Sequence, residues 1–252
     1  MDERDDKITP VIWTRMQRAA RGPEPSLTHE KIARAAIEIA DAEGLAGLSM
    51  RKVAAKVGAG TMSLYRYVTN KDDDLLDLMV DTVLAENPVP DEPSGDWRFD
   101  LAESARRSRR MAHRHPWALP LILGRPSVGP NWMRQTEYGL ACVVGLGLPM
   151  DRMLDLVTTV SAFTAGYVQT ELAGAEAQRR TGLTEEQYRL AAGPWLVEML
   201  ATGKYPLLQR FIEEAEDFPD TDEVFERRLA QVISGLADNL PDAAETGRPG
   251  RA

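Results

Sequence analysis

Side chains suited to reading DNA are concentrated in residues 60–68, whose sequence is GTMSLYRYV. Leu64 and Val68 lie four residues apart, so on a helix both would point to the same side. The other side would then carry hydroxyls, a flexible methionine, a phenol and a guanidinium, which belong to Thr61, Met62, Ser63, Tyr65 and Arg66. Such groups bond phosphates, contact thymine methyl groups and read guanine edges in a major groove. The stretch therefore predicts a surface that binds double-stranded DNA.

The charge of the chain is unevenly distributed. The formal net charge is -9, yet residues 11–71 hold ten Lys or Arg and only five Asp or Glu. A basic segment in an acidic chain favours a polyanion as the partner of that segment. A merely solvated charged surface explains the same counts, so charge alone leaves both interpretations open.

Two short helices are predicted to position this surface. Residues 26–44 and 48–58 show apolar side chains at helical spacing, and a third, longer helix is expected from Asn70. The expected boundaries are the N-caps Thr28 and Ser49 and the terminating glycines Gly44 and Gly58. A helix, a glycine turn and a second helix form the helix-turn-helix pattern, although a surface helical hairpin has the same appearance.

Residues 40–79 strongly resemble the DNA-binding domain of the tetracycline-repressor (TetR) family of regulators, and the match extends over about residues 28–86. Its most specific part is LYRYV at 64–68, followed by Asn70 and Lys71. The resemblance implies base contacts by Thr61, Met62, Ser63 and Arg66, phosphate contacts by Tyr65, Tyr67 and Lys71, and a groove contact by Arg51. One departure is Asp72–Asp74, which has one residue more than the family pattern and would place carboxylates beside phosphates.

The remainder of the chain predicts helices throughout, so the expected fold class is all-α. A three-helix helix-turn-helix domain is followed by a helical effector-binding and dimerisation domain. The expected divisions are an N-terminal arm at 1–26, a DNA-binding head at 27–86, a body at 97–240 and a flexible tail at 241–252, with a Pro- and Gly-rich loop before the body. The arm is expected to be flexible. Its arginines, Arg15, Arg18 and Arg21, either reach DNA beside the head or belong to a disordered tail.

The helices at 150–178 and 222–239 carry wide apolar stripes and need cover from other helices. In the resembled family the corresponding helices pair with those of a second subunit as a four-helix bundle, which implies a homodimer. The interface residues expected on this basis are Val157, Val168, Leu229, Ile233 and Leu236. Burial of the same stripes within one chain is the alternative.

Residues 97–237 resemble, more loosely, the ligand-binding domain of regulators closest to the tetracycline repressor. The resemblance implies a cavity for a small hydrophobic effector. The expected lining residues are Trp117, Trp132, Tyr138, Phe163, Thr164, Tyr167, Gln169 and Trp195. For each aromatic residue, packing in the core is the competing explanation.

Other chemistry has little support in the sequence. No Ser/His/Asp constellation or Gly-rich phosphate loop is present, so we expect no enzyme activity, no catalytic residue and no cofactor. His113 and His115 are two residues apart and diverge on a helix, which makes them a poor metal pair. The longest apolar run, at 140–150, is too short to span a bilayer, so no membrane partner is expected. The single cysteine, Cys142, fits a reducing cytoplasm.

The sequence therefore predicts a cytoplasmic, homodimeric transcription regulator. We expect a repressor that is released from a palindromic operator when a small hydrophobic effector binds the body. The alternative is a DNA-binding module whose helical body binds a protein partner and has no effector. A filled core around Phe163 and Trp195 would favour the alternative.

Overall fold

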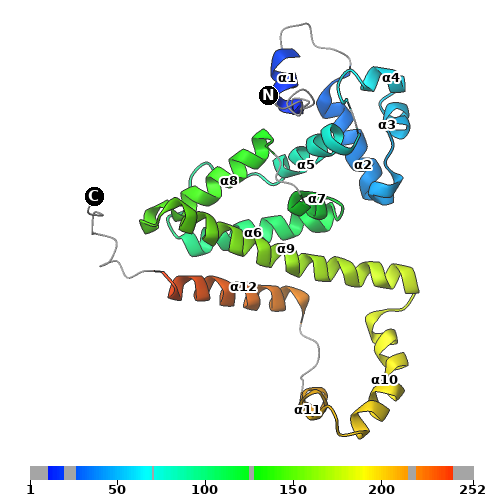
Figure 1. Ribbon diagram of the computed structural model, residues 1–252, viewed down its shortest axis with the longest axis vertical. Coiled ribbons are helices and arrows are strands. Elements are labelled where there is room, and N and C mark those ends of the chain that lie inside the picture. The colour runs from blue at the N-terminus through cyan, green and yellow to red at the C-terminus, as the bar shows by residue number, and fades with distance from the viewer. Residues whose placement is uncertain (1–10, 20–26, 70, 125–127, 215–219, 241–252) are drawn as a thin grey trace, which may run out of the picture. The chain divides into compact units, whose positions relative to one another are not determined.

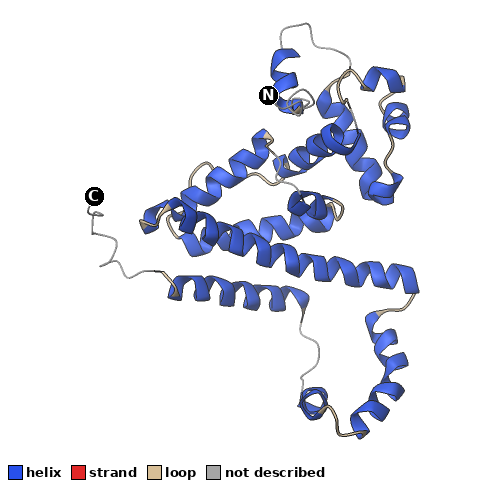
Figure 2. Cartoon of the chain, viewed as in Figure 1, coloured by secondary structure: helices blue, strands red, loops and turns tan. Residues whose placement is uncertain are grey.

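The computed structural model describes residues 11–19, 27–69, 71–124, 128–214 and 220–240. Every regular element in these ranges is a helix, as Figure 2 shows, which confirms the all-α prediction. The chain forms two compact units, Met1–Thr158 and Thr159–Ala252. The first unit contains the head together with the first helices of the body, so the compact units do not divide at the loop before residue 97.

The head consists of helices α2 (His29–Gly47), α3 (Met50–Lys56), α4 (Thr61–Leu64) and α5 (Leu76–Ala85), which Figure 1 shows in blue to cyan. The predicted boundaries are confirmed. The hydroxyl of Thr28 accepts from the backbone N–H of Lys31 at 3.2 Å, and that of Ser49 accepts from Lys52 at 3.3 Å. Gly44 breaks α2 and Gly58 ends α3, at φ 70° and 69° respectively, a conformation that favours glycine.

The recognition segment is held by two fully buried side chains. Leu64 and Val68 have no exposed surface and belong to one apolar core with Ile32, Val53 and Met79. The prediction that Leu64 and Val68 point inward is therefore confirmed. Because these two side chains fix the turn that follows α4, the residues between and before them are held on the outside.

The turn that contains the extra aspartate is a π-helix, η2 (Lys71–Leu75). A π turn holds one residue more than an α turn, so the additional residue is absorbed there and α5 follows directly. Asp74 is buried and accepts from the backbone N–H of Thr69 at 2.7 Å. The departure at Asp72–Asp74 therefore does not place the Asp74 carboxylate beside phosphates. Asn70 lies outside the described residues.

Part of the N-terminal arm is structured, which corrects the prediction of a flexible arm for that part. Helix α1 (Ile12–Ala19) places Ile12, which is 1% exposed, in the core of the head. The guanidinium of Arg15 pairs with the carboxylate of Asp74. Residues 1–10 and 20–26, and the side chain of Arg18, lie outside the described part, so the expected DNA contacts of Arg18 and Arg21 stay predictions.

Helix α5 joins the head to α6 (Trp97–Arg114), α7 (Ala118–Gly124) and α8 (Pro130–Val143) within the first unit. The buried carboxylate of Asp81 accepts from the backbone N–H groups of Asn131 and Trp132 at 2.9 and 3.1 Å. It therefore caps the N-terminus of α8. Gly129 must lack a side chain because a Cβ atom there would lie 2.1 Å from Asp81. Polar bonds thus fix α5 to α8.

The second unit contains most of α9 (Met150–Thr181), followed by α10 (Glu185–Ala201), α11 (Pro206–Glu214) and α12 (Thr221–Asp238). Figure 1 shows α12 running alongside α9. The rings of Phe163 and Tyr167 on α9 lie 5.9 and 5.2 Å from that of Phe225 on α12. Neither α10 nor α11 has a buried residue. No described helix is long and apolar enough to cross a membrane.

Candidate DNA-binding surface and effector site

The predicted base-reading residues form one exposed edge of the head. Met62 is 79% exposed, and Tyr65, Arg66 and Arg51 are also exposed. Thr61 and Ser63 are half-buried within α4, so their hydroxyls lie at the rim of this edge. We call the set Arg51, Thr61, Met62, Ser63, Tyr65 and Arg66 the reading edge. Its hydroxyls, methionine and guanidinium are the groups that phosphates and base edges require.

Several other cations of the head are neutralised by carboxylates on α2. Lys52 pairs with Glu43, and Lys56 pairs with Glu38 at 2.7 Å. Arg51 and Arg66 form no ion pair within the described residues. The positive charge that is available to a polyanion is therefore concentrated at the reading edge and not spread evenly over α3.

Tyr67 differs from the other predicted phosphate contacts because it packs inward. Its ring meets that of His29 edge-on at 5.2 Å, and the carbonyl oxygen of Tyr67 lies 3.2 Å from His29 Nε2. Burial lowers the pKa of His29. Tyr67 thus also positions the end of the recognition segment. The side chain of Lys71 lies outside what is described, so its phosphate contact stays a prediction.

The predicted effector residues are divided between the two compact units. Trp117, Trp132 and Tyr138 belong to the first unit, whereas Phe163, Thr164, Tyr167, Gln169 and Trp195 belong to the second. The Trp117 indole donates to Asp41 at 2.6 Å, and Trp132 packs partly buried against the core of the head. Both tryptophans thus pack within the first unit, and their part in an effector site stays a prediction.

The second-unit members of the set are either packed or exposed. Phe163 and Tyr167 pack against Phe225, and the Thr164 hydroxyl donates to the Val160 carbonyl at 2.8 Å. Trp195 is 64% exposed, and Gln169 is exposed. Phe163 thus packs in the small core of the second unit, while the Trp195 side chain lies at the surface of the described chain.

A polar cluster on α6 includes residues that the sequence analysis did not single out. The Arg107 Nε atom is buried and has no hydrogen-bond partner among the described residues, while the guanidinium carbon lies 5.6 Å from the centre of the Tyr138 ring. Asp100 lies on the same face of α6 as Arg107, because the two are seven residues apart. Its carboxylate is buried and accepts from the Ser94 backbone N–H at 3.0 Å. Burial raises the pKa of Tyr138 to about 12 and that of Cys142 to about 11. The sequence signal that could have identified this cluster is the pair Asp100 and Arg107, whose opposite charges are seven residues apart.

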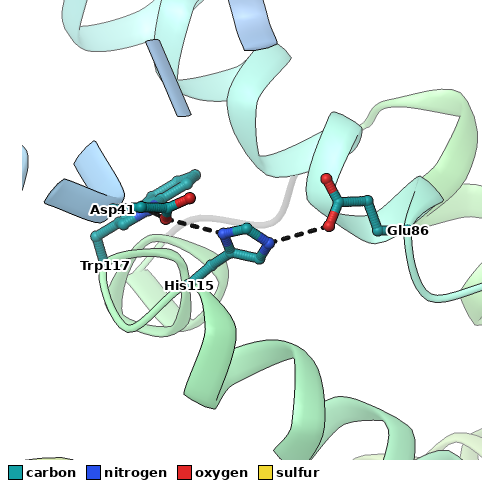
Figure 3. Close-up of polar contacts among 4 residues, drawn as sticks. All are labelled: Asp41, Glu86, His115 and Trp117. Atoms are coloured by element: carbon teal, nitrogen blue, oxygen red, sulfur yellow. Dashed lines mark hydrogen bonds and ion pairs between the residues drawn. The ribbon is translucent and has the colours of Figure 1, made fainter. Parts of the chain in front are cut away.

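A second polar cluster connects the head to the end of α6 (Figure 3). The His115 ring is buried, with Nδ1 2.9 Å from an Asp41 carboxylate oxygen and Nε2 3.0 Å from a Glu86 carboxylate oxygen. Trp117 donates to the same Asp41 oxygen. His113, two residues earlier, is exposed. The expected divergence of the two histidines is thus confirmed, and His115 has carboxylates as partners.

Comparison with known proteins identifies the family. The family model for the tetracyclin repressor-like C-terminal domain matches residues 89–240. The HTH-type transcriptional repressor DrrR1 of Streptomyces coeruleorubidus is 41% identical over 228 residues, which are 90% of this chain and 83% of that protein. The chain belongs to the TetR family of transcriptional regulators. The class A tetracycline repressor from transposon 1721 of Escherichia coli is 30% identical and spans 82% of this chain.

Solved structures of the TetR family agree with this assignment. Streptomyces coelicolor ActR in complex with actinorhodin matches with a TM-score of 0.70 at 30% identity, covering 86% of this chain and 98% of ActR. ActR without ligand matches with a TM-score of 0.69. The relatives are repressors and ActR holds small molecules, so the family assigns this chain the function of a ligand-responsive transcriptional repressor.

Most of the predicted dimer-interface residues of this TetR-family chain are covered by the chain itself. Val168 and Leu229 are each 1% exposed, and Ile233 is also buried. Val157 packs on Gly139, where a Cβ atom would lie 2.9 Å from it, and Leu236 is half-buried. The prediction that these stripes form a surface for a partner is therefore wrong for the three buried residues, because α9 and α12 cover each other.

The opposite faces of α9 and α12 are exposed and lined by small side chains. They include Ala162 and Gly166 on α9 and Ala230, Ser234 and Gly235 on α12. A Cβ atom added at Gly166 or Gly235 would meet nothing within 4 Å. Glycine within a helix destabilises it by roughly 0.5–1 kcal/mol relative to alanine. A partner backbone that approaches closely is one reason to keep glycine at such positions.

Proposed function

We propose that the chain represses transcription in the cytoplasm as a homodimer on a palindromic operator, from which a small aromatic effector releases it. The observation that carries the DNA-binding part is the reading edge. Buried Leu64 and Val68 hold it outward, and its Arg51 and Arg66 have no carboxylate partner among the described residues. The domain division into an arm, a head and a body is part of the same proposal.

We propose different roles for the members of the reading edge. Arg66, Thr61, Met62 and Ser63 contact bases, while Tyr65, together with Tyr67 and Lys71, contacts the phosphate backbone. A bidentate contact between arginine and guanine contributes about 1–3 kcal/mol of discrimination against other bases. Arg51 begins α3 and reaches the groove from the side.

Selection of bound fragments from genomic DNA tests this proposal. The wild type should select a palindrome, and Arg66→Ala should lose preference at one symmetric pair of positions. Arg34→Ala is the matched control because Arg34 is an exposed cation of the head that pairs with Glu30 at 2.7 Å. An unchanged preference profile for Arg66→Ala would contradict its role as a base-reading residue.

The homodimer is proposed to form through the small-residue faces of α9 and α12. Their glycines meet nothing within the chain, and the family resemblance assigns these helices to a bundle of two subunits. The twofold axis of such a dimer would present two reading edges to successive major grooves, about 34 Å apart. A palindromic operator follows from that symmetry.

The effector is proposed to contact the polar cluster at Arg107 and Tyr138. ActR, which matches 86% of this chain, is known in complex with actinorhodin, a suitable first probe. Arg107 Nε needs a partner, since a buried donor without one costs about 1–3 kcal/mol. Binding should quench tryptophan fluorescence and release operator, and Arg107→Met should weaken binding more than Arg110→Met, which alters an exposed arginine of the same helix.

The exposed apolar residues of α10 and α11 favour a second candidate function, in which this part of the body binds a protein partner. Tyr188, Leu190, Trp195, Leu207 and Phe211 are all more than half exposed. Monomeric proteins rarely leave large contiguous apolar patches uncovered. If no compound shifts the melting temperature and a partner protein binds through these residues, the second candidate replaces the effector.

A further inference from the structure

We propose that His115 is a positioning residue that holds the DNA-binding head in its operator-binding position on α6, and that it does so as an imidazolium. The inference rests on the proposed repressor function and adds a pH-sensitive control of operator binding to it. It is carried by the cluster in Figure 3, where one buried ring bridges two carboxylates from separate helices.

The geometry requires two protons on the ring. Nδ1 faces Asp41 at 2.9 Å and Nε2 faces Glu86 at 3.0 Å, and a carboxylate is only an acceptor. Neutral imidazole has one N–H, so one of the two contacts would place a nitrogen lone pair against a carboxylate oxygen. The imidazolium donates at both positions, and such charge-assisted bonds are about twice as strong as neutral ones.

The three residues belong to the segments that must stay in register when the head binds DNA. Asp41 lies on α2, against which α3 packs, and Glu86 directly follows α5. His115 is the C-cap of α6, the helix that carries Arg107. A shift at the end of α6 therefore moves the ring away from one or both carboxylates. This connects the proposed effector site to the helices that support the reading edge.

The charges around the ring determine the direction of the pH effect. The charged groups that face it are Asp41 from α2 and Glu86 from the end of α5, while α7 has no titratable side chain. Its neighbours on α6, His113 and Arg114, are exposed. When the ring loses its proton, two carboxylates remain on either side of a neutral group. A neutral ring has one N–H for two carboxylates, so loss of the proton weakens the bridge and with it operator binding.

Asp41 keeps one donor in either state, since the Trp117 indole N–H lies 2.6 Å from the same oxygen. A neutral ring has one N–H, so loss of the proton breaks one of the two contacts. Replacing Glu86 by glutamine changes this outcome, because the amide can donate to an unprotonated Nε2 while Nδ1–H still donates to Asp41. Glu86→Gln is thus expected to preserve the bridge at high pH, whereas His115→Gln removes it at every pH.

The test measures operator affinity by fluorescence anisotropy from pH 5.5 to 8.5 at constant ionic strength, with the operator that the wild type selects. We expect wild-type affinity to fall about tenfold over this range, a usual size for coupling between sites. His115→Gln should be weak and independent of pH, Glu86→Gln should be tight and nearly independent of pH, and His113→Gln should follow the wild type. Burial lowers the pKa of His29, and the comparison with His115→Gln removes its contribution.

Two results would overturn the proposal. Either His115→Gln retains the wild-type pH profile, or Glu86→Gln weakens with pH as the wild type does. A purely structural role would lower the melting temperature of both variants without separating their pH profiles. If the wild type selects no DNA, the repressor function fails, and the melting temperature measured over the same pH range still decides the inference. It should fall with pH for the wild type more steeply than for Glu86→Gln.

Discussion

The unit that ends at Thr158 and the unit that begins at Thr159 differ in what covers their apolar side chains. In the first, large residues such as Leu64, Met79 and Leu101 are almost fully buried, and buried Asp81 and Asp100 accept backbone hydrogen bonds. In the second, α10 and α11 bury nothing, and Trp195 and Phe211 are exposed. The helices of the head thus cover one another's apolar side chains, whereas α10 and α11 have apolar surface that a partner would cover.

The difference shows what an apolar helical pattern leaves undecided. The stripes of α9 and α12 face each other, so the second unit has its own small core around Phe225, Val168 and Leu229. The apolar side chains of α10 and α11, such as Trp195 and Phe211, remain exposed within the described part of the chain. Periodicity predicts which side of a helix is apolar, but not whether the cover comes from the same chain.

The largest expected effect is on the core of the second unit. Phe225 is fully buried and stacks on Phe163, so Phe225→Ala should lower the free energy of unfolding by about 3–5 kcal/mol. Urea unfolding followed by circular dichroism measures this. A loss of unfolding free energy below 1 kcal/mol would mean that the second unit has no core of its own. The statement that α9 and α12 bury each other's apolar side chains would then be wrong.

The next effect concerns the polar bonds of the first unit. Asp81→Ala removes the acceptor for the backbone N–H groups of Asn131 and Trp132, and unsatisfied buried donors cost about 1–3 kcal/mol each. We expect a loss of stability and weaker protection of α8 amides against hydrogen exchange. Asp81→Asn retains one acceptor oxygen and should cost less. Equal losses for both variants would show that charge, and not the cap, stabilises this contact.

Substitution of an exposed glycine on α12 is expected to change the stability of the single chain little and its assembly into a dimer much more. Gly235→Leu adds a side chain where a Cβ atom meets nothing within 4 Å, so the single chain should keep its melting temperature. The dimer should dissociate, because the added side chain separates the paired helices. Light scattering at micromolar concentration measures the mass. Ala85→Leu, at an exposed position on α5, is the control that should stay dimeric.

The head could be predicted from the sequence because its determinants are local. Caps such as Thr28 and Ser49 act within three residues, and the spacing of Leu64 and Val68 states which side of the recognition segment is buried. The cluster at His115 could not be predicted, since Asp41 and Glu86 lie 74 and 29 residues away in the chain. The effector residues stay a prediction, because aromatic type alone does not tell a core residue from a cavity wall.

The smallest effect expected for a single chain is at Trp195, and it tests the second unit most directly. The side chain is 64% exposed on a helix without buried residues, so Trp195→Ser removes little packing within the chain. Substitutions at such surface positions usually change stability by less than about 0.5 kcal/mol. If a partner copy covers α10, however, the same substitution removes buried aromatic surface from the interface. Urea unfolding at two protein concentrations separates the cases, since only an interface residue makes the loss depend on concentration. A loss that is large and independent of concentration would mean that Trp195 packs within its own chain, and the contrast between the two units would then disappear at α10.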